Sequence, residues 1–146
     1  MGLELRLSPH AEPGELRPLL RSIRRGADLP LWVKLPLTGI ADLAQAAATA
    51  GADALVIASP PLGAGLTGQG TLVRGDLFGP AAFAPMLAAL VTVAELALEL
   101  PLIACGGIHT PQQVRQALAA GAVAVQLDSV VWVEPGAVGR LLVSRD

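Results

Sequence analysis

Short apolar runs alternate with longer amphipathic or alanine-rich segments along the whole chain. Residues 3–7 read Leu-Glu-Leu-Arg-Leu, and this period of two predicts a half-buried strand. The apolar run 101–105 is typical of a strand buried on both faces. Further strands are expected at 31–35, 53–58 and 123–127, and helices at 15–25, 40–50, 82–99 and 135–143. Residues 60–79 contain six glycines and are expected to form a long loop, of the kind that serves as a lid or binding loop.

The order of these elements predicts an α/β fold with a parallel sheet. Residues 47–57 (AATAGADALVI) and 118–127 (LAAGAVAVQL) repeat one pattern of helix end, Gly-Ala turn and strand. Repeated βα units with short turns imply right-handed crossovers between parallel strands. About five strands are expected, whereas a closed (β/α)8 barrel needs eight strands and about 250 residues. The chain is therefore either a small open α/β sheet or a partial TIM (β/α)8 barrel.

Composition narrows the class of protein. Hydrophobic residues make up 53% of the 146 residues and the net charge is −2, so the chain has a sizeable core and lacks the basic surface of a nucleic-acid-binding protein. The arginines at 21, 24 and 25 are interpreted as a solvated helix face. The apolar stretch 81–100 contains Pro85, Glu95 and Glu99 and is expected to be a buried helix rather than a membrane span. A single cysteine, Cys105, excludes an internal disulfide and favours a cytoplasmic protein in which it is a core residue.

Candidate chemistry follows two neighbouring strands. Gly106 and Gly107 stand at the end of the strand 101–105, where a missing Cβ lets backbone N–H groups approach a ligand. The next residues, 110–113 (TPQQ), have the order of a helix N-cap with a capping box. Asp128 and Ser129 end the following strand. Such a pair of turns forms the phosphate site of many (β/α)8 barrels, although a glycine pair alone is more often only a tight turn. No metal site is expected.

Four segments, in order, resemble the dihydroorotate dehydrogenase family, whose members are FMN-dependent (β/α)8 barrels of pyrimidine biosynthesis. These segments are 30–35 (PLWVKL), 51–59 (GADALVIAS), 75–87 (GDLFGPAAFAPML) and 101–132, which contains both turns. The resemblance covers nearly the whole chain and only about the last five strands of the family's barrel. It implies that residues 1–146 form a single domain, the carboxyl-terminal portion of such a barrel.

The resemblance also implies roles for individual residues. Lys34 would lie at the polar edge of the flavin, where a cation stabilises the reduced ring; its spacing alone favours a strand-end lysine in solvent. Gly79 would approach the cofactor through its backbone. Backbone N–H groups would bind the FMN phosphate, and those expected belong to Gly106, Gly107, Asp128 and Ser129.

The chain departs from the family at the substrate side of the site. Ser8 is the candidate for the catalytic base, but His10 stands where the family has an asparagine, and residues 8–10 are equally well interpreted as a turn. Ser59 replaces a substrate-binding asparagine and would contact a pyrimidine edge less rigidly. His109 is expected to be a surface residue before the N-cap.

These observations predict an FMN-dependent oxidoreductase that converts dihydroorotate to orotate once the missing barrel strands are supplied. Two alternatives stay open: a phosphate-ligand-binding α/β barrel protein without redox activity, and a non-catalytic fragment. The expected partners are a small dihydroorotate-like substrate and either further copies of the chain, as a homo-oligomer, or a complementary amino-terminal half-barrel. No nucleic acid or membrane partner is expected.

Overall fold

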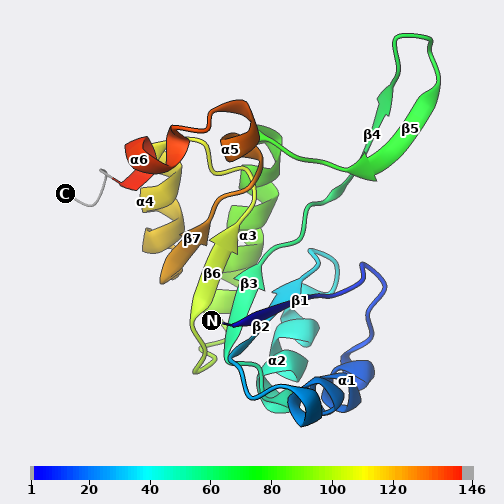
Figure 1. The fold of residues 1–146 in the computed structure, drawn as a ribbon, viewed down its shortest axis with the longest axis vertical. Helices are drawn as coiled ribbons and strands as arrows, with labels where there is room; N and C mark the ends of the chain where they lie inside the picture. Colours follow the sequence, from blue (N-terminus) through cyan, green and yellow to red (C-terminus); the bar gives the residue numbers. More distant parts are fainter. Residues whose placement is uncertain (1, 143–146) are drawn as a thin grey trace.

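Five parallel strands form one sheet in the computed structural model, which describes residues 2–142 (Figure 1). The strands lie in the sheet in the order in which they occur along the chain, β1-β2-β3-β6-β7. Every neighbouring pair is parallel. Their bounds are β1 Leu3–Arg6, β2 Leu31–Leu35, β3 Ala54–Ile57, β6 Leu102–Cys105 and β7 Ala124–Gln126. The predicted alternation of about five parallel strands with helices is confirmed.

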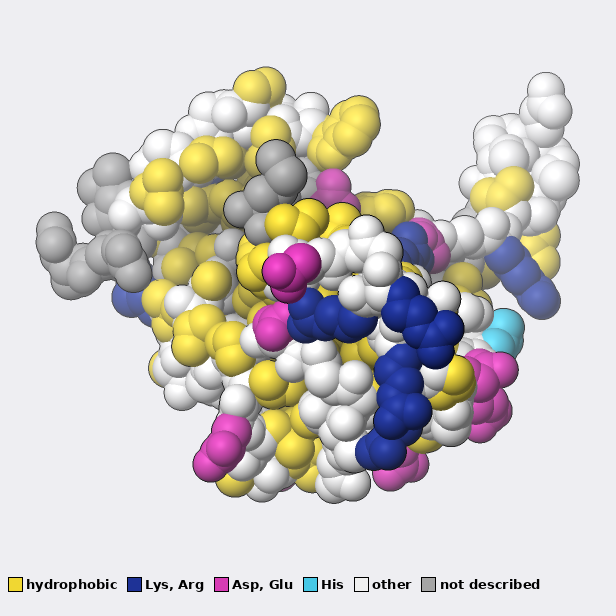
Figure 2. Space-filling view, turned by 60° about the horizontal axis from the view of Figure 1, so that its bottom comes forward, with side chains coloured by type: hydrophobic (Ala, Val, Ile, Leu, Met, Phe, Trp, Pro, Cys, Tyr) yellow, Lys and Arg dark blue, Asp and Glu magenta, His cyan; other side chains and the backbone are white. Residues whose placement is uncertain are grey.

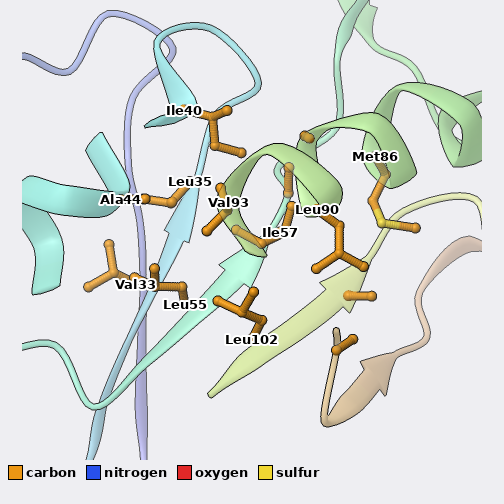
Figure 3. Packing of buried hydrophobic residues seen from close by; sticks show 14 of the residues in the cluster. Val33, Leu35, Ile40, Ala44, Leu55, Ile57, Met86, Leu90, Val93 and Leu102 are labelled. Atoms are coloured by element: carbon orange, nitrogen blue, oxygen red, sulfur yellow. The ribbon is translucent and has the colours of Figure 1, made fainter. Parts of the chain in front are cut away.

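Helices cover one face of this sheet. Leu31, Val33 and Leu35 of β2 are buried, whereas Trp32 and Lys34 between them point to the opposite face, as the period of two requires. Figure 3 shows the buried face of β2, β3 and β6 packed against α3. The covering helices are α1 Pro13–Gly26, α2 Ile40–Ala50, α3 Phe83–Ala94 and α4 Pro111–Ala119.

The sheet curls so strongly that its two outer strands meet through their side chains. In a flat sheet, β1 and β7 would lie four strand spacings apart, or about 19 Å. Instead, Gln126 Nε2 of β7 donates a hydrogen bond of 2.9 Å to Glu4 Oε2 of β1. Lys34 Nζ lies between them, 2.8 Å from Gln126 Oε1 and 3.2 Å from Glu4 Oε1. This curvature is that of a partial barrel, with the Glu4–Lys34–Gln126 cluster inside.

A β-hairpin replaces the loop expected at residues 60–79, so that expectation was wrong. Strands β4 (Leu62–Leu66) and β5 (Leu72–Asp76) pair antiparallel and project from the body of the molecule (Figure 1). In β4 the glycines alternate with apolar residues, and the cross-strand partners Leu66 and Leu72 allow a ladder to form despite the glycines. An ion pair of 2.7 Å between Arg6 and Asp76 ties the base of the hairpin to β1.

Two predicted helices have different bounds in the structure. The segment expected at 82–99 begins with a 3-10 turn, Pro80–Ala82, and its α-helix ends at Ala94; Ala97, with a φ of 49°, cannot continue it. The closing helix expected at 135–143 is α6, Ala137–Leu142, and Val143 lies outside the described residues. A separate short helix, α5 (Ser129–Val133), precedes it and ends before Pro135.

The arginines of α1 are only partly a solvated face. Figure 2 shows Lys and Arg side chains gathered in one strip on the side of the molecule that carries α1. Arg21 and Arg25 are exposed, but Arg24 donates hydrogen bonds to Asp53 and to the Leu29 carbonyl oxygen. Arg24 therefore links α1 to the start of β3. Within residues 2–142, no helix combines the length and the hydropathy that crossing a membrane requires.

Candidate functional site

A pocket opens at the carboxyl ends of β2, β3, β6 and β7. It encloses about 460 Å³ of space, part of which is open to solvent. Ligand sites in parallel α/β folds occur at this edge because the loops that follow successive strands converge there. Seven of the eight residues predicted for the site line the pocket: Lys34, Ser59, Gly79, Gly106, Gly107, Asp128 and Ser129.

The Gly106–Gly107 turn needs glycine at its second position. Gly107 has a φ of +67°, and a Cβ there would lie 2.2 Å from the backbone nitrogen of Phe83, closer than any real contact. Gly107 is buried, yet no acceptor among residues 2–142 takes its backbone N–H, and the same is true of Gly106. Buried backbone N–H groups are almost always paired, so the unpaired one of Gly107, with that of the half-buried Gly106 beside it, fits an anionic ligand.

The turn after β7 supplies further donors at the same pocket. Within the described chain, the backbone N–H groups of Asp128 and Ser129 also find no acceptor. The Asp128 carboxylate accepts a hydrogen bond of 3.2 Å from the indole nitrogen of Trp132. The Trp132 side chain therefore engages the Asp128 carboxylate, while the backbone N–H of Asp128 remains available to a ligand.

Ser129 also joins the loops around the pocket. Its Oγ accepts a hydrogen bond of 3.2 Å from the backbone N–H of Gly79 and lies 3.3 Å from His109 Nε2. The Gly79 N–H is therefore already paired within the chain. His109 is half-buried behind Ser129 rather than free on the surface.

The floor of the pocket combines a cation with a thiol. The Lys34 side chain is only 11% exposed and is held by Glu4 and Gln126. Burial raises the pKa of the Cys105 thiol, and the nearby Lys34 ammonium acts in the opposite direction. Cys105 is the buried residue expected from the sequence, but it also lines the pocket, as does Gln126. The period of two places both on the same face as Lys34, and that signal could have identified them.

Ser59 has an unsatisfied hydroxyl inside the pocket. The residue is 5% exposed, and its Oγ has no hydrogen-bond partner. Its backbone N–H donates to the Leu35 carbonyl oxygen at 2.8 Å, which fixes the residue at the ends of β2 and β3. A buried hydroxyl without a partner costs about 1–3 kcal/mol, so this group fits a polar ligand that would satisfy it.

Ser8 does not line the pocket. It is exposed at the end of β1, and its Oγ accepts a hydrogen bond of 3.2 Å from the backbone N–H of His10. The structure thus forms the turn that the sequence offered as an alternative, and the role of Ser8 as a base stays a prediction. Within residues 2–142, no group of three His, Cys, Asp or Glu side chains is arranged to hold a metal ion.

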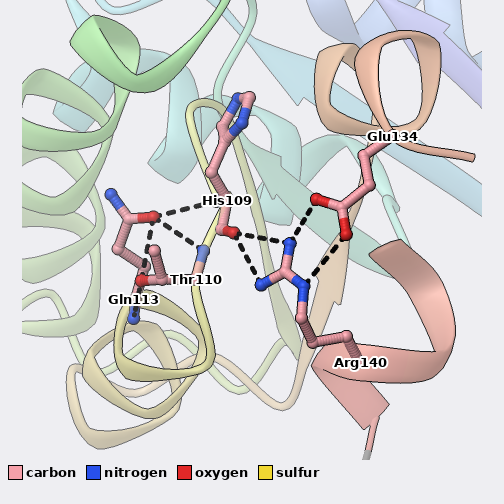
Figure 4. A network of polar contacts seen from close by, with 5 residues as sticks. All are labelled: His109, Thr110, Gln113, Glu134 and Arg140. Carbon is pink, nitrogen blue, oxygen red and sulfur yellow. Dashed lines mark hydrogen bonds and ion pairs between the residues drawn. The ribbon is translucent and has the colours of Figure 1, made fainter. Parts of the chain in front are cut away.

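A polar network fixes the glycine turn from behind (Figure 4). Gln113 Oε1 accepts the backbone N–H groups of His109 and Thr110, and Thr110 Oγ1 accepts that of Gln113, as the predicted capping box requires. Arg140 of α6 donates to the His109 carbonyl oxygen and pairs with Glu134. The hydrogen bond from Arg140 lowers the pKa of the Glu134 carboxyl group.

Fold and site together define a class of protein: a parallel α/β barrel-type chain with a pocket at its strand ends, lined by backbone N–H groups without an acceptor in the described chain. Residues 26–133 match the family model described as nitronate monooxygenase. Because this match covers more than half of the chain, the chain belongs to the nitronate monooxygenase family.

Curated relatives confirm the resemblance to dihydroorotate dehydrogenases. The chain is 31% identical over 137 residues to the dihydroorotate dehydrogenase B (NAD(+)) catalytic subunit of Geobacter sp. (strain M21), covering 89% of the chain and 45% of the relative. The subunit of the same name from Bacillus pumilus (strain SAFR-032) is 31% identical over 131 residues, which cover 85% of the chain and 42% of the relative. Dihydroorotate dehydrogenase A (fumarate) of Lacticaseibacillus paracasei is 31% identical over 137 residues, which cover 89% of the chain and 47% of the relative. The chain spans less than half the length of these relatives.

Proposed function

We propose that this chain is the cofactor-holding part of an FMN-dependent oxidoreductase of the dihydroorotate dehydrogenase type. The observation that carries the proposal is the set of four unpaired backbone N–H groups, at Gly106, Gly107, Asp128 and Ser129, on two adjacent turns of one pocket. These donors suit the phosphate of FMN, and Lys34 in the same pocket suits the polar edge of a flavin. The names of the relatives supply the reaction class.

The residues present fit such a cofactor on three grounds. The buried Gly107 N–H has no acceptor in the described chain, the Ser59 hydroxyl lacks a partner, and Lys34 lines the same pocket. FMN, when bound, supplies the acceptor for the hydride that the substrate loses. Lys34 would then stabilise negative charge near it, and Ser59 would hold the substrate by a hydrogen bond.

In this proposal Ser8 takes the proton that dihydroorotate loses on becoming orotate. Serine is a weak base and needs activation. In the structure the Ser8 hydroxyl is engaged by the His10 backbone, at the end of β1 and outside the pocket. The substrate side of the site therefore requires rearrangement or completion, and we propose that the missing strands provide it.

The first test is the visible absorbance of the purified chain after incubation with FMN and removal of free cofactor. We expect retained flavin, with weaker retention of riboflavin, which lacks the phosphate that the four N–H groups would bind. Bleaching of the retained flavin by dihydroorotate then tests the chemistry. Equal retention of FMN and riboflavin would contradict the phosphate site, and no retention by any assembled form would contradict the cofactor.

A second candidate is a protein that binds a phosphorylated metabolite without redox chemistry. It is favoured by the position of Ser8 outside the pocket, because the proposed anion site then lacks the serine base that the resemblance implies. Thermal melting distinguishes the two: a sugar phosphate that protects better than FMN favours this candidate. A non-catalytic fragment would retain no flavin, or would retain a flavin that dihydroorotate does not bleach.

We also propose that a complementary amino-terminal half-barrel closes the sheet, residues 1–146 being a single domain of the assembled barrel. In a ring of eight strands, the first and fifth lie opposite each other, and Glu4 and Gln126 meet as side chains of opposite strands do. Three further strands then fill the ring. Without them the edges of β1 and β7 stay open, so the chain should self-associate as a homo-oligomer.

Light scattering over a range of concentrations tests this partner proposal. The expected result is a mass that grows with concentration, because open strand edges and the exposed Trp132 and Val133 favour association. A stable monomer at every concentration would contradict it. Two further parts of this proposal are a cytoplasmic location, which the single cysteine favours, and a place in pyrimidine biosynthesis, which the family resemblance implies.

A further inference from the structure

The hydroxyl of Ser129 stands where three loops meet. Its Oγ is 3.2 Å from the backbone nitrogen of Gly79, which follows β5, and 3.3 Å from His109 Nε2, which follows β6. Ser129 itself follows β7 and lines the pocket, whereas His109 lies behind it and does not. The imidazole can therefore reach a pocket ligand only through this hydroxyl.

The single proton of the hydroxyl decides what Ser129 offers to a ligand. The Gly79 N–H donates to Oγ, so the Ser129 proton is free to be donated elsewhere. When Nε2 of a neutral imidazole carries no proton, it accepts that proton. When the imidazole is protonated, Nε2 donates to Oγ instead, and the hydroxyl proton is released for a pocket ligand.

We propose that His109 is a positioning residue of the phosphate site: its protonation turns Ser129 into a hydrogen-bond donor to the phosphate. The inference rests on the proposed function, because it assigns His109 to the same anion site. Protonation also places a positive charge on the imidazole, which is separated from the bound anion only by the Ser129 hydroxyl. This charge attracts the anion and so strengthens its binding further. Phosphate ligands therefore bind more tightly when the imidazole is protonated than when it is neutral.

The charged side chains near His109 are engaged by partners of their own. Arg140 of α6 contacts the His109 carbonyl oxygen and is neutralised by its ion pair with Glu134. Asp128, before α5, is held by Trp132. Among residues 2–142, no carboxylate is hydrogen-bonded to the imidazole. Histidine side chains as a class change charge between pH 5 and 8, so pH is the variable that tests the charge of this imidazole.

The test measures the dissociation constants of FMN and riboflavin from pH 5.5 to 8.5 for the wild type and for His109→Gln. At each pH the affinity of the wild type is divided by that of the variant. This ratio removes the effect of the ionisation of the FMN phosphate, because both proteins bind the same ligand. For FMN this ratio should rise about tenfold towards low pH, the size of one charge-assisted hydrogen bond. For riboflavin it should stay flat. His10→Gln changes the other histidine, outside the pocket, and should match the wild type.

A second measurement needs no ligand. Nitrogen chemical shifts of the His109 ring in the neutral form should show the proton on Nδ1, with Nε2 as the acceptor from Ser129, and Ser129→Ala should shift the Nε2 resonance. A proton on Nε2 in the neutral form, or a flat FMN ratio, would overturn the inference. If no flavin binds at any pH while the ring has the expected tautomer, the proposed cofactor fails and the Ser129–His109 contact stands.

Discussion

Individual residues here act through partners that are far away in the sequence. Asp53 is an example, because its carboxylate accepts the backbone N–H of Leu31 at 2.6 Å and is paired with Arg24. The Leu31 N–H is the main cause that lowers the pKa of Asp53, and the Arg24 contact adds to it. One side chain therefore joins α1, the start of β2 and the start of β3.

Asp53 should make the fold sensitive to acid. Since its pKa is lower in the folded than in the unfolded chain, its stabilising contribution is complete above the ordinary aspartate pKa and is lost as the pH falls through the folded value. Urea unfolding from pH 7 to 3 should show a shallower loss of stability for Asp53→Asn than for the wild type. Asp42→Asn, on the exposed side of α2, is the control; a wild-type slope for Asp53→Asn would refute the role.

Gly107 should tolerate no side chain. Gly107→Ala combines a positive φ with a contact of 2.2 Å to the Phe83 nitrogen, so we expect a loss of at least about 2 kcal/mol in the free energy of unfolding. Gly68→Ala, which meets nothing within 4 Å, should change stability by less than about 0.5 kcal/mol. Equal stabilities of the two variants in urea would contradict the strained turn.

At the scale of elements, the sequence predicted the features that depend on residues close together in the chain. The N-cap of α4 at Thr110, with its capping box to Gln113, is confirmed because capping depends on residues three apart. The hairpin was missed because its stability depends on pairing across Leu62–Leu66 and Leu72–Asp76, and its glycines mask the strand pattern. The early end of α3 depends on the turn at Ala97, which no composition signal marks.

The capping box of α4 offers an element-scale prediction. Thr110→Ala removes the acceptor of the Gln113 N–H and should cost about 1 kcal/mol in the free energy of unfolding. Thr92→Ala, the same exchange on the exposed side of α3, should stay within about 0.5 kcal/mol of the wild type. Chemical denaturation measures both, and a larger loss for Thr92→Ala would contradict the assignment of the cap.

For the whole molecule, the sequence predicted which strand ends form the pocket but not how the sheet bends. Lys34, Ser59 and the glycine pair converge because the carboxyl ends of parallel strands share one edge. Ser8 also ends a strand, but it lies outside the pocket because its turn is held by local hydrogen bonding. The Glu4–Lys34–Gln126 cluster joins residues up to 122 positions apart, and no local signal marks such a contact.

The curvature of the sheet is directly measurable. In a Cys105→Ala background, Glu4→Cys combined with Gln126→Cys should be joined within one chain by a short bis-maleimide, because the native side chains touch at 2.9 Å. A flat sheet would hold the two strands about 19 Å apart and prevent this. Mass spectrometry distinguishes a joined monomer from joined dimers; only joined dimers, or no product, would contradict the curled sheet. Each single-cysteine variant serves as the control.

The two turns with unpaired N–H groups both lie within residues 102–133, a run of two consecutive βα units. Such a run can be inherited or exchanged by recombination as one piece, together with the backbone N–H groups of both turns. The groups expected to meet the substrate, Ser8 and Ser59, lie outside it on other loops. Substrate preference can therefore diverge between descendants of one ancestral gene while the proposed phosphate site is passed on unchanged.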